Sequence, residues 1–247
     1  MTEFQVVVIG AGPGGYLTAI KLSQLGQKVA LIENDKLGGE CLNYGCIPSK
    51  TMINTSDMYH KMSDLSIQGI EFESVKVDLE TFQTWKNSIT KKLRGGIDLL
   101  CKNYGVEIVF GTAKIRNPNL VEVINGENKK EISTEYIIIA TGSRAKDLED
   151  LRFDGNQIIS AKDVLDLNKV PKSMLIVGGG AIGLELGTAL AKFGTQVTII
   201  EITDKLLPDI EQDLVNVIER SADEIGIKVL LNSRITEISK ESEVVVS

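Results

Sequence analysis

The fold is decided by FQVVVIGAGPGGYLTAIKLSQLGQKVALIE, Phe4 to Glu33, because this stretch occurs a second time in the chain. KSMLIVGGGAIGLELGTALAKFGTQVTIIE, Lys172 to Glu201, aligns with it without a gap, at a constant offset of 168 residues. In each copy an apolar run is followed by three glycines, a segment of helical periodicity and a second apolar run that ends in a glutamate. Each copy is therefore predicted to form a strand, a helix and a second strand.

The glycines and the final acid of each copy have the spacing of a dinucleotide-binding fold. The three glycines are Gly10, Gly12 and Gly15 in the first copy, and Gly178, Gly180 and Gly183 in the second. Such glycines allow a tight turn, a close approach of the backbone to a pyrophosphate, and close packing of helix on strand. Glu33 and Glu201 each lie 23 residues after the first glycine, where a carboxylate can bind ribose hydroxyls. The sequence thus predicts two nucleotide sites, as in a protein that moves electrons between two carriers.

Composition and charge narrow the class of protein. The chain has 247 residues, of which 43% are hydrophobic and 25% charged, so it is long enough for one large or two small domains. A net charge of −7 and a pI near 5.0 argue against a nucleic-acid partner, since phosphate binding needs clustered Lys and Arg. The start, MTEFQVVVIGAG, lacks the basic region of a signal peptide, and no apolar run reaches the length of a membrane span. We expect a cytoplasmic protein with no membrane partner.

Two of the three cysteines lie close together in GGECLNYGCIPSK, Gly38 to Lys50. A cysteine pair in a reducing compartment is more often catalytic or metal-binding than structural. Zinc takes about four ligands, and the remaining soft candidates are Cys101, expected to be a buried thiol, and the single histidine, His60. No metal site is therefore expected. The residues alone leave an inert bridge, two separate thiols and a redox pair as alternatives.

The string around the two cysteines resembles the redox-active disulfide signature of the pyridine nucleotide-disulfide oxidoreductases, flavoproteins that bind FAD and NAD(P). Within that family it is most similar to the dihydrolipoyl dehydrogenases. The resemblance covers the chain in order: the first glycine fingerprint, the cysteine pair, the ATGS segment and the second fingerprint. It implies a disulfide in which Cys41 exchanges with a dithiol substrate, a lipoyl group on a carrier protein, while Cys46 lies beside the flavin. Glu40, where the family usually has threonine, and Tyr44, after Asn43, leave the contacts of those two side chains open.

The resemblance also implies the residues of each cofactor site. For FAD they are Gly10, Gly12, Gly14, Gly15, Glu33, Gly39, Glu40, Cys41, Lys50, Ala113, Thr141, Gly142 and Ser143. For NAD they are Gly178, Gly180, Gly183 and Glu201. Because no arginine follows closely after Glu201 to bind a 2′-phosphate, NAD is predicted in preference to NADP.

Glu185 is a departure from the internal repeat, because the matching residue of the first copy is the apolar Leu17. It lies two residues after Gly183, about 200° round the helix, and should therefore face away from the sheet. The resemblance implies that it pairs with Lys50 near the flavin, across the boundary between domains. Lys50 and Glu185 thus join Cys41 and Cys46 as predicted catalytic residues.

The predicted fold is α/β, with two Rossmann-like dinucleotide-binding domains that carry inserted antiparallel β-meanders. Residues 1–147 are expected to form an FAD-binding domain with the redox-active disulfide, and residues 148–247 an NAD-binding domain. Between the repeats we expect a long helix over Asp78 to Gly105, despite Gly95 and Gly96, then short strands in VEIVFGTAKI, LVEVIN, KKEIST and EYIIIATGS.

Members of the family are nearly twice as long as this chain. We therefore expect a truncated protein without the C-terminal dimerisation domain, whose full-length form is a homodimer. That domain also supplies the acid-base histidine of the family, and His60 is not expected to replace it, so the chain alone should be poorly active. The alternatives are a mercuric-reductase-like or other disulfide reductase, and a nucleotide-binding fragment without turnover.

Overall fold

The computed structural model describes residues 2–65, 69–70, 74–148, 151–238 and 244–246. The chain divides into two compact units, each made of two segments. The first comprises Met1–Pro48 and Thr84–Glu149, and the second comprises Ser49–Gln83 and Asp150–Ser247. Over the ranges described, no helix is both long and apolar enough to cross a membrane.

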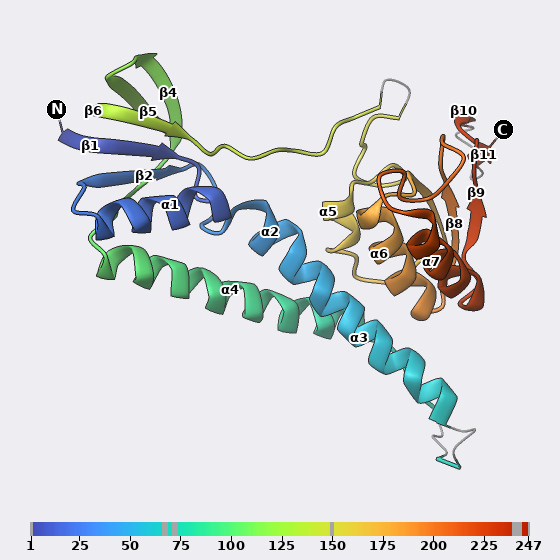
Figure 1. The fold of residues 1–247 in the computed structure, drawn as a ribbon. Coiled ribbons are helices and arrows are strands. Elements are labelled where there is room, and N and C mark those ends of the chain that lie inside the picture. The colour runs from blue at the N-terminus through green and yellow to red at the C-terminus, as the bar shows by residue number, and fades with distance from the viewer. Residues whose placement is uncertain (1, 66–68, 71–73, 149–150, 239–243, 247) are drawn as a thin grey trace. The chain divides into compact units, whose positions relative to one another are not determined.

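The first unit is built on a mixed six-stranded sheet with the strand order β3-β2-β1-β6-β5-β4 (Figure 1). Its strands are β1 (Thr2–Ile9), β2 (Val29–Glu33), β3 (Glu107–Phe110), β4 (Thr112–Asn117), β5 (Leu120–Asn125) and β6 (Asn128–Ile139). The pairs of β1 with β2, β2 with β3 and β1 with β6 are parallel, and β4, β5 and β6 form an antiparallel meander. The inserted meander predicted for this domain is therefore present.

Apolar side chains on both faces explain why β1 and β2 read as continuous apolar runs. Along β1, Val6 and Val8 lie in one buried cluster, whereas Val7 and Ile9 lie in another. Alternate residues of a strand point to opposite faces, so each strand contributes to two cores. A strand covered on both sides is apolar throughout, which is typical of parallel sheets.

Strand β6 is longer than the sequence predicted. The pattern indicated two short strands, in KKEIST and EYIIIATGS, but Asn128–Ile139 is a single strand that ends before ATGS. The residues of β6 from Asn128 to Ser133 pair with β5, and those from Ile132 to Ile139 pair with β1. Because the two ladders overlap at Ile132 and Ser133, hydrogen bonding carries the strand through the polar residues that suggested a break.

Four helices belong wholly or partly to this half of the chain: α1 (Pro13–Gln24), α2 (Gly39–Tyr44), α3 (Cys46–Asp64) and α4 (Leu79–Asn103). The long helix predicted over Asp78 to Gly105 is confirmed as α4, which continues through Gly95 and Gly96. Its free Cys101 is buried, as expected. Residues 46–48 of α3 belong to the first unit, and the rest of the helix belongs to the second.

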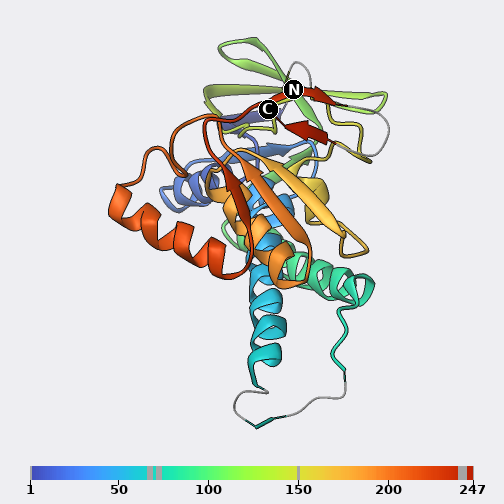
Figure 2. The ribbon, with the colours of Figure 1, turned by 90° about the vertical axis from the view of Figure 1, so that its right-hand side faces the viewer.

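The second unit contains a parallel sheet of three strands, β7 (Ser173–Val177), β8 (Gln196–Ile200) and β9 (Lys228–Leu230). Figure 2 shows these strands side by side. Helix α5 (Ala161–Val164) precedes β7, α6 (Ala181–Lys192) connects β7 to β8, and α7 (Gln212–Glu224) lies between β8 and β9. After β9, β10 (Ile235–Ile238) pairs antiparallel with β11 (Val244–Val246). Buried side chains of α6, β8 and α7 form one core with those of the segment 49–83.

The internal repeat is reproduced in three dimensions. Helix α1 begins at residue 13 and ends at residue 24, and α6 begins at residue 181 and ends at residue 192, so both ends differ by the offset of the sequence alignment. Each helix follows the first strand of its copy and leads into the second, as predicted. The fold is thus the predicted one, with two Rossmann-like units.

Candidate functional site: two dinucleotide turns and a disulfide

The turn between β1 and α1 depends on three glycines with three different tasks. Gly10 has a φ of +102°, and a Cβ built on it would lie 2.2 Å from the carbonyl oxygen of Ala140. A Cβ on Gly15 would lie 1.7 Å from the carbonyl oxygen of Gly10, so helix and turn are in backbone contact. Gly12 is extended, and the nearest atom to its added Cβ is the Cα of Gly39, 3.7 Å away. The turn is therefore closed at Gly10 and Gly15 and open at Gly12.

The turn between β7 and α6 repeats this arrangement. Gly178 has a φ of +104°, and a Cβ on Gly183 would lie 2.4 Å from the carbonyl oxygen of Gly178. A Cβ on Gly180 would meet no atom within 4 Å. Gly12 and Gly180, at which a side chain would have room, each immediately precede the first turn of their helix. Neither provides a side-chain cap. Both helices thus present uncapped backbone N–H groups, which favour an anion such as a phosphate.

The glutamate that ends each repeat is bonded to the glycine turn of its own copy. Glu33 Oε2 accepts a hydrogen bond from the backbone N–H of Ala11 at 2.7 Å, and Glu201 Oε2 accepts one from the N–H of Gly179 at 2.7 Å. Ala11 and Gly179 are equivalent residues of the repeat. Each carboxylate therefore fixes the turn as well as offering a remaining lone pair, since two carboxylate oxygens have about four acceptor sites.

The second oxygen of each glutamate bonds to the residues that follow it. Glu33 Oε1 accepts from the backbone N–H groups of Asn34 and Asp35, and Glu201 Oε1 accepts from the N–H and hydroxyl of Thr203. Burial acts to raise the pKa of the Glu201 carboxyl, but the hydrogen bonds from Thr203 and Gly179 outweigh it and hold that pKa below its usual value of 4.5. The carboxylate of Glu201 is thus kept ionised, as an acceptor for hydroxyl groups must be.

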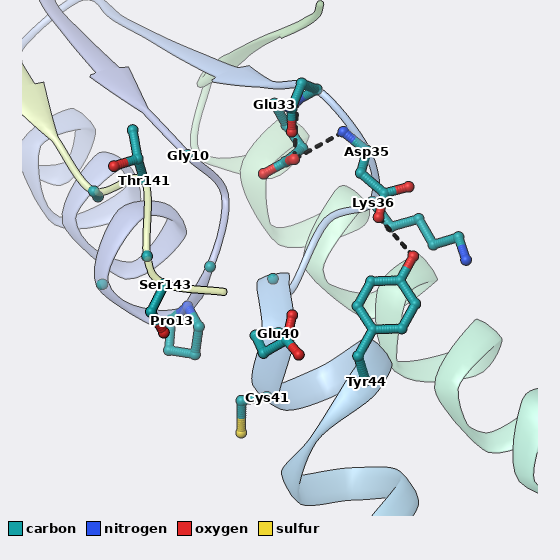
Figure 3. A pocket seen from close by; sticks show the side chains of 16 residues that line it. Gly10, Pro13, Glu33, Asp35, Lys36, Glu40, Cys41, Tyr44, Thr141 and Ser143 are labelled. Atoms are coloured by element: carbon teal, nitrogen blue, oxygen red, sulfur yellow. Dashed lines mark hydrogen bonds between the residues drawn. The ribbon is translucent and has the colours of Figure 1, made fainter. Parts of the chain in front are cut away.

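A pocket with a volume of about 480 Å³ opens at the first turn (Figure 3). The predicted FAD-site residues in its wall are Gly10, Gly12, Gly14, Glu33, Gly39, Glu40, Cys41, Thr141, Gly142 and Ser143. Each of these belongs to the first unit. The strand end, the glycine turn, α2 and the segment after β6 therefore converge on one concave surface.

Three predicted FAD-site residues lie elsewhere. Gly15 packs against Gly10 behind the turn, Ala113 lies in β4 against the core cluster around Val121 and Val123, and Lys50 belongs to the second unit. The pocket wall also contains residues that the sequence reasoning did not select: Pro13, Asn34, Asp35, Lys36, Tyr44 and Ala140. Asn34 to Lys36 directly follow Glu33, the carboxylate predicted to bind ribose hydroxyls. Their position in the sequence could therefore have indicated that they line the same pocket.

Cys41 and Cys46 form a disulfide, with their Cα atoms 4.6 Å apart. Cys41 lies in α2 and Cys46 begins α3, and the helices are separated by Gly45, whose φ and ψ of −137° and −108° interrupt the helical path. Cys41 is one of the residues that line the pocket, and Figure 3 shows it next to Glu40 at the edge of the site. One cysteine of the disulfide, Cys41, therefore lies in the wall of a pocket of nucleotide-binding type.

The contact predicted between Lys50 and Glu185 is present. Lys50 Nζ lies 2.7 Å from Glu185 Oε1 and 2.6 Å from Oε2, so one ammonium bridges both carboxylate oxygens. Both residues belong to the second unit, because the part of α3 from Ser49 onward groups with α6. The pair therefore lies within one unit, and not across a boundary between domains as predicted. Leu17, the repeat partner of Glu185, is 56% exposed, which agrees with an outward-facing slot on the helix.

Across the described part of the chain, no group of three or more His, Cys, Asp or Glu side chains is arranged to hold a metal ion. Cys101 lies in the core cluster under α1. Burial, and secondarily the charge of Asp98, raises the pKa of the Cys101 thiol, which disfavours the reactive thiolate. The redox chemistry of the described cysteines therefore belongs to Cys41 and Cys46.

A family model described as pyridine nucleotide-disulphide oxidoreductase matches residues 4–247. Among curated proteins, dihydrolipoyl dehydrogenase from Geobacillus stearothermophilus is 44% identical over 231 residues, which cover 94% of this chain and 49% of that protein. Dihydrolipoyl dehydrogenase 2 from Haloarcula marismortui is 42% identical, over 92% of this chain and 48% of that protein. The chain spans about half the length of the curated relatives it matches.

Solved structures of similar fold include the flavoprotein disulfide reductase RclA from Escherichia coli, determined as a Cu(II) complex. Its TM-score is 0.85 at 28% identity, over 100% of this chain and 53% of that chain. LpdA from Mycobacterium tuberculosis has a TM-score of 0.86 over 98% of this chain and 54% of that chain. At 23% identity, the second likeness bears on the fold alone.

Proposed function

The chain belongs to the pyridine nucleotide-disulphide oxidoreductase family, and on that premise we propose that it passes electrons from a dithiol, through the Cys41–Cys46 disulfide and FAD, to NAD⁺. The proposal is carried by one observation: Cys41 of the Cys41–Cys46 disulfide lies in the wall of a pocket that also contains the first glycine turn. The dithiol is proposed to be a lipoyl group, since the relatives that match the chain at 42–44% identity are named dihydrolipoyl dehydrogenase.

The residues of the first pocket fit the FAD that the family implies. Gly12 leaves room for a close approach to the uncapped start of α1, where a pyrophosphate would be bound by backbone N–H groups. Glu33, whose Oε2 accepts one N–H, retains acceptor capacity for a ribose hydroxyl. Gly142, with a φ of +70°, and the flanking Thr141 and Ser143 form the opposite wall. Bound there, FAD supplies the two-electron chemistry that links a thiol pair to a nicotinamide.

The two cysteines would divide the thiol chemistry between them. A substrate thiolate attacks one sulfur of the disulfide, forming a mixed disulfide and releasing the other enzyme sulfur as a thiolate. The second substrate thiol then displaces the enzyme sulfur, so the substrate leaves as a disulfide and the enzyme holds two thiols. By family resemblance, Cys41 exchanges with the substrate and Cys46 is the flavin-side thiolate. Lys50, held by Glu185, is proposed to supply a fixed positive charge to the reduced flavin.

The second turn is proposed to bind NAD in preference to NADP. Glu201 is buried and its carboxylate is held ionised, so a 2′-phosphate placed beside it would be repelled. The nearest basic residue that follows, Lys205, donates from Nζ to the carbonyl oxygen of Ile210 at 3.0 Å. The side chain that might have neutralised a phosphate is thus engaged within its own loop.

Counting thiols before and after exposure to dihydrolipoamide tests the proposal. The chain, denatured after air oxidation, should show one titratable thiol, from Cys101, and three after reduction by the dithiol. Cys101→Ser is the matched control and should lower both counts by one. With FAD and NAD⁺ added, the dithiol should also produce NADH absorbance. Three thiols in the oxidised chain would contradict a redox-active pair, and a disulfide that dihydrolipoamide cannot reduce would contradict the substrate class.

A further inference from the structure

The six-residue helix α2 carries Cys41, and side chains near its end tie it to the loop that precedes it. Tyr44 Oη donates a hydrogen bond to Asp35 Oδ2 at 2.5 Å, and Figure 3 shows the Tyr44 ring reaching from α2 to this carboxylate. Asn43 Nδ2 donates to the carbonyl oxygens of Leu37 and Gly39, both at 2.9 Å. The helix that positions one sulfur of the disulfide is therefore also held by bonds that survive reduction.

The loop that receives the Tyr44 hydroxyl is itself anchored. The backbone N–H of Asp35 donates to Glu33 Oε1 at 2.8 Å, and Glu33 ends the buried strand β2. Lys36 Nζ lies 4.9 Å from the centre of the Tyr44 ring, a cation–π distance. Tyr44 thus connects α2 to a rigid strand end, so its hydrogen bond restricts the helix and not merely a mobile side chain.

We propose that Tyr44 is a positioning residue for the Cys41–Cys46 pair, and that its bond to Asp35 lowers the reduction potential of the disulfide. This inference rests on the redox role proposed above. The disulfide and the Tyr44–Asp35 bond order the same short segment, so each reduces the conformational entropy that the other must overcome. Coupling of this kind is reciprocal: if the disulfide strengthens the bond, then the bond stabilises the disulfide to the same degree.

The direction of the effect follows from the reaction that measures it. The disulfide and reduced dithiothreitol give two protein thiols and oxidised dithiothreitol, with two electrons and two protons passing to the protein. Without the Tyr44 bond, the reduced segment gains freedom that re-forming the disulfide must remove. Loss of one such bond should shift this equilibrium about fivefold toward the dithiol. At about 30 mV per tenfold change for a two-electron couple, the potential rises by roughly 20 mV.

The experiment compares the dithiothreitol equilibrium of the purified chain and its variants at one pH near 6.5, with acid quenching, alkylation and mass analysis. Tyr44→Phe removes the hydroxyl and keeps the ring that faces Lys36. Asp35→Ala removes the acceptor, and Asp35→Asn keeps an acceptor oxygen while removing the charge. Tyr136→Phe is the matched control, since it deletes a hydroxyl from a tyrosine on β6 that is 65% exposed.

Tyr44→Phe and Asp35→Ala should each shift the equilibrium about fivefold, and the double variant should shift it no further, because both remove the same bond. Asp35→Asn should lie closer to the wild type, and Tyr136→Phe should match it. Equal potentials in Tyr44→Phe and the wild type would overturn the inference, as would a shift toward the disulfide. Should Tyr44→Phe not fold, the contrast between Asp35→Ala and Asp35→Asn decides the question. A wild-type disulfide that dithiothreitol cannot reduce would instead contradict the proposed function.

Discussion

Gly15 and Gly183 perform the same task in the two repeats, and a single added carbon tests it. At both positions a Cβ would meet the carbonyl oxygen of the first glycine, at 1.7 Å for Gly15 and 2.4 Å for Gly183. At Gly14 and Gly180 a Cβ would meet no atom within 4 Å. The glycine spacing of the sequence therefore separates into residues needed for packing and residues needed for an open approach.

Gly15→Ala should destabilise the first unit by about 2 kcal/mol, because the backbone of α1 must move away from Gly10. Gly14→Ala, one residue earlier on the same helix, should be neutral or slightly stabilising, since alanine lowers the entropy of the unfolded chain. Urea unfolding followed by circular dichroism measures both. Equal destabilisation by the two variants would show that helix propensity, and not the contact with Gly10, accounts for the effect.

The acid that closes each repeat has a consequence for stability as well as for binding. The pKa of Glu201 lies below its usual value of 4.5 in the folded chain. A group whose pKa is lowered by folding contributes stability above its unfolded pKa and loses that contribution as the pH falls through the folded value. Glu201→Gln should therefore lower the free energy of unfolding by about 1 kcal/mol near pH 7.

The difference between the wild type and Glu201→Gln should shrink as the pH falls below about 4.5, where the wild-type carboxyl becomes protonated. Unfolding curves at pH 7, 5 and 4 measure the trend, with Glu211→Gln, at an exposed residue before α7, as a control for loss of one negative charge. A difference that stays constant or grows toward acid would show that the hydrogen bonds of Glu201 do not depend on its ionised form.

At the scale of elements, the attachment of α3 to α6 was only partly predictable. The repeat indicated Glu185, because it replaces an apolar residue of the first copy, and the family resemblance supplied Lys50 as its partner. A second ion pair, Lys192 Nζ with Asp57 Oδ1 at 2.5 Å, lies seven residues further along both helices, since 57 − 50 and 192 − 185 are both seven. Equal spacing in the same direction means that the two helices run parallel in register. No signal in the sequence joined Asp57 to Lys192, because Lys192 fits the last turn of α6 without a partner.

The Asp57–Lys192 pair should hold this register more firmly than the Lys50–Glu185 pair. The side chains of Lys192 and Asp57 are 20% and 37% exposed, against 59% and 40% for Lys50 and Glu185, so water screens the second pair more strongly. A double-mutant cycle with Asp57→Asn and Lys192→Met should give a coupling free energy of about 1 kcal/mol. The same cycle with Lys50→Met and Glu185→Gln should give a smaller coupling free energy, of about 0.3 kcal/mol.

Urea unfolding of the wild type and the three variants of each cycle provides the measurement. It is repeated at high salt, where the coupling of the more exposed pair should disappear first. The Tyr59 and Phe193 rings, with centroids 6.0 Å apart, belong to residues close in sequence to Asp57 and Lys192, and they are left unchanged in every variant. A larger coupling for Lys50 with Glu185 would mean that this pair, and not the more buried one, sets the position of α3.

For the whole molecule, the repeat predicted far more than any single motif did. The offset located two strand-helix-strand units and the glutamate that ends each of them. The structure adds that α1 and α6 have equivalent ends and that each glutamate bonds to its own turn. The long β6 and the placement of residues 49–83 with the second unit depend on pairing and packing between distant segments. Such partners are set by tertiary contacts that local patterns do not contain. Tyr44 was missed as a pocket residue for the same reason, whereas Asp35, two residues after Glu33, had a local signal that was not used.

The two turns are so alike that their backbone geometry does not assign one cofactor to each. The assignment rests on what surrounds them: Cys41 lies in the wall of the first pocket, and Glu201, without a neighbouring arginine, ends the second repeat. The first turn should therefore bind FAD and the second NAD. Glu33→Gln and Glu201→Gln form a matched pair of variants. Each replaces one carboxylate oxygen by an NH2 group, and the two residues occupy equivalent positions of the repeat.

Glu33→Gln should weaken FAD binding about tenfold and leave NADH binding unchanged, because a charged acceptor for a ribose hydroxyl is lost from one site only. Glu201→Gln should weaken NADH binding by a similar factor and narrow its preference over NADPH, since the charge that repels a 2′-phosphate is removed. Flavin and nicotinamide fluorescence titrations give the four dissociation constants, with circular dichroism to show that both variants remain folded. If one substitution weakened both nucleotides and the other neither, the two turns would not be separate sites. If the effects were exchanged, the assignment of FAD to the disulfide-bearing unit would be wrong, even though each turn bound a nucleotide.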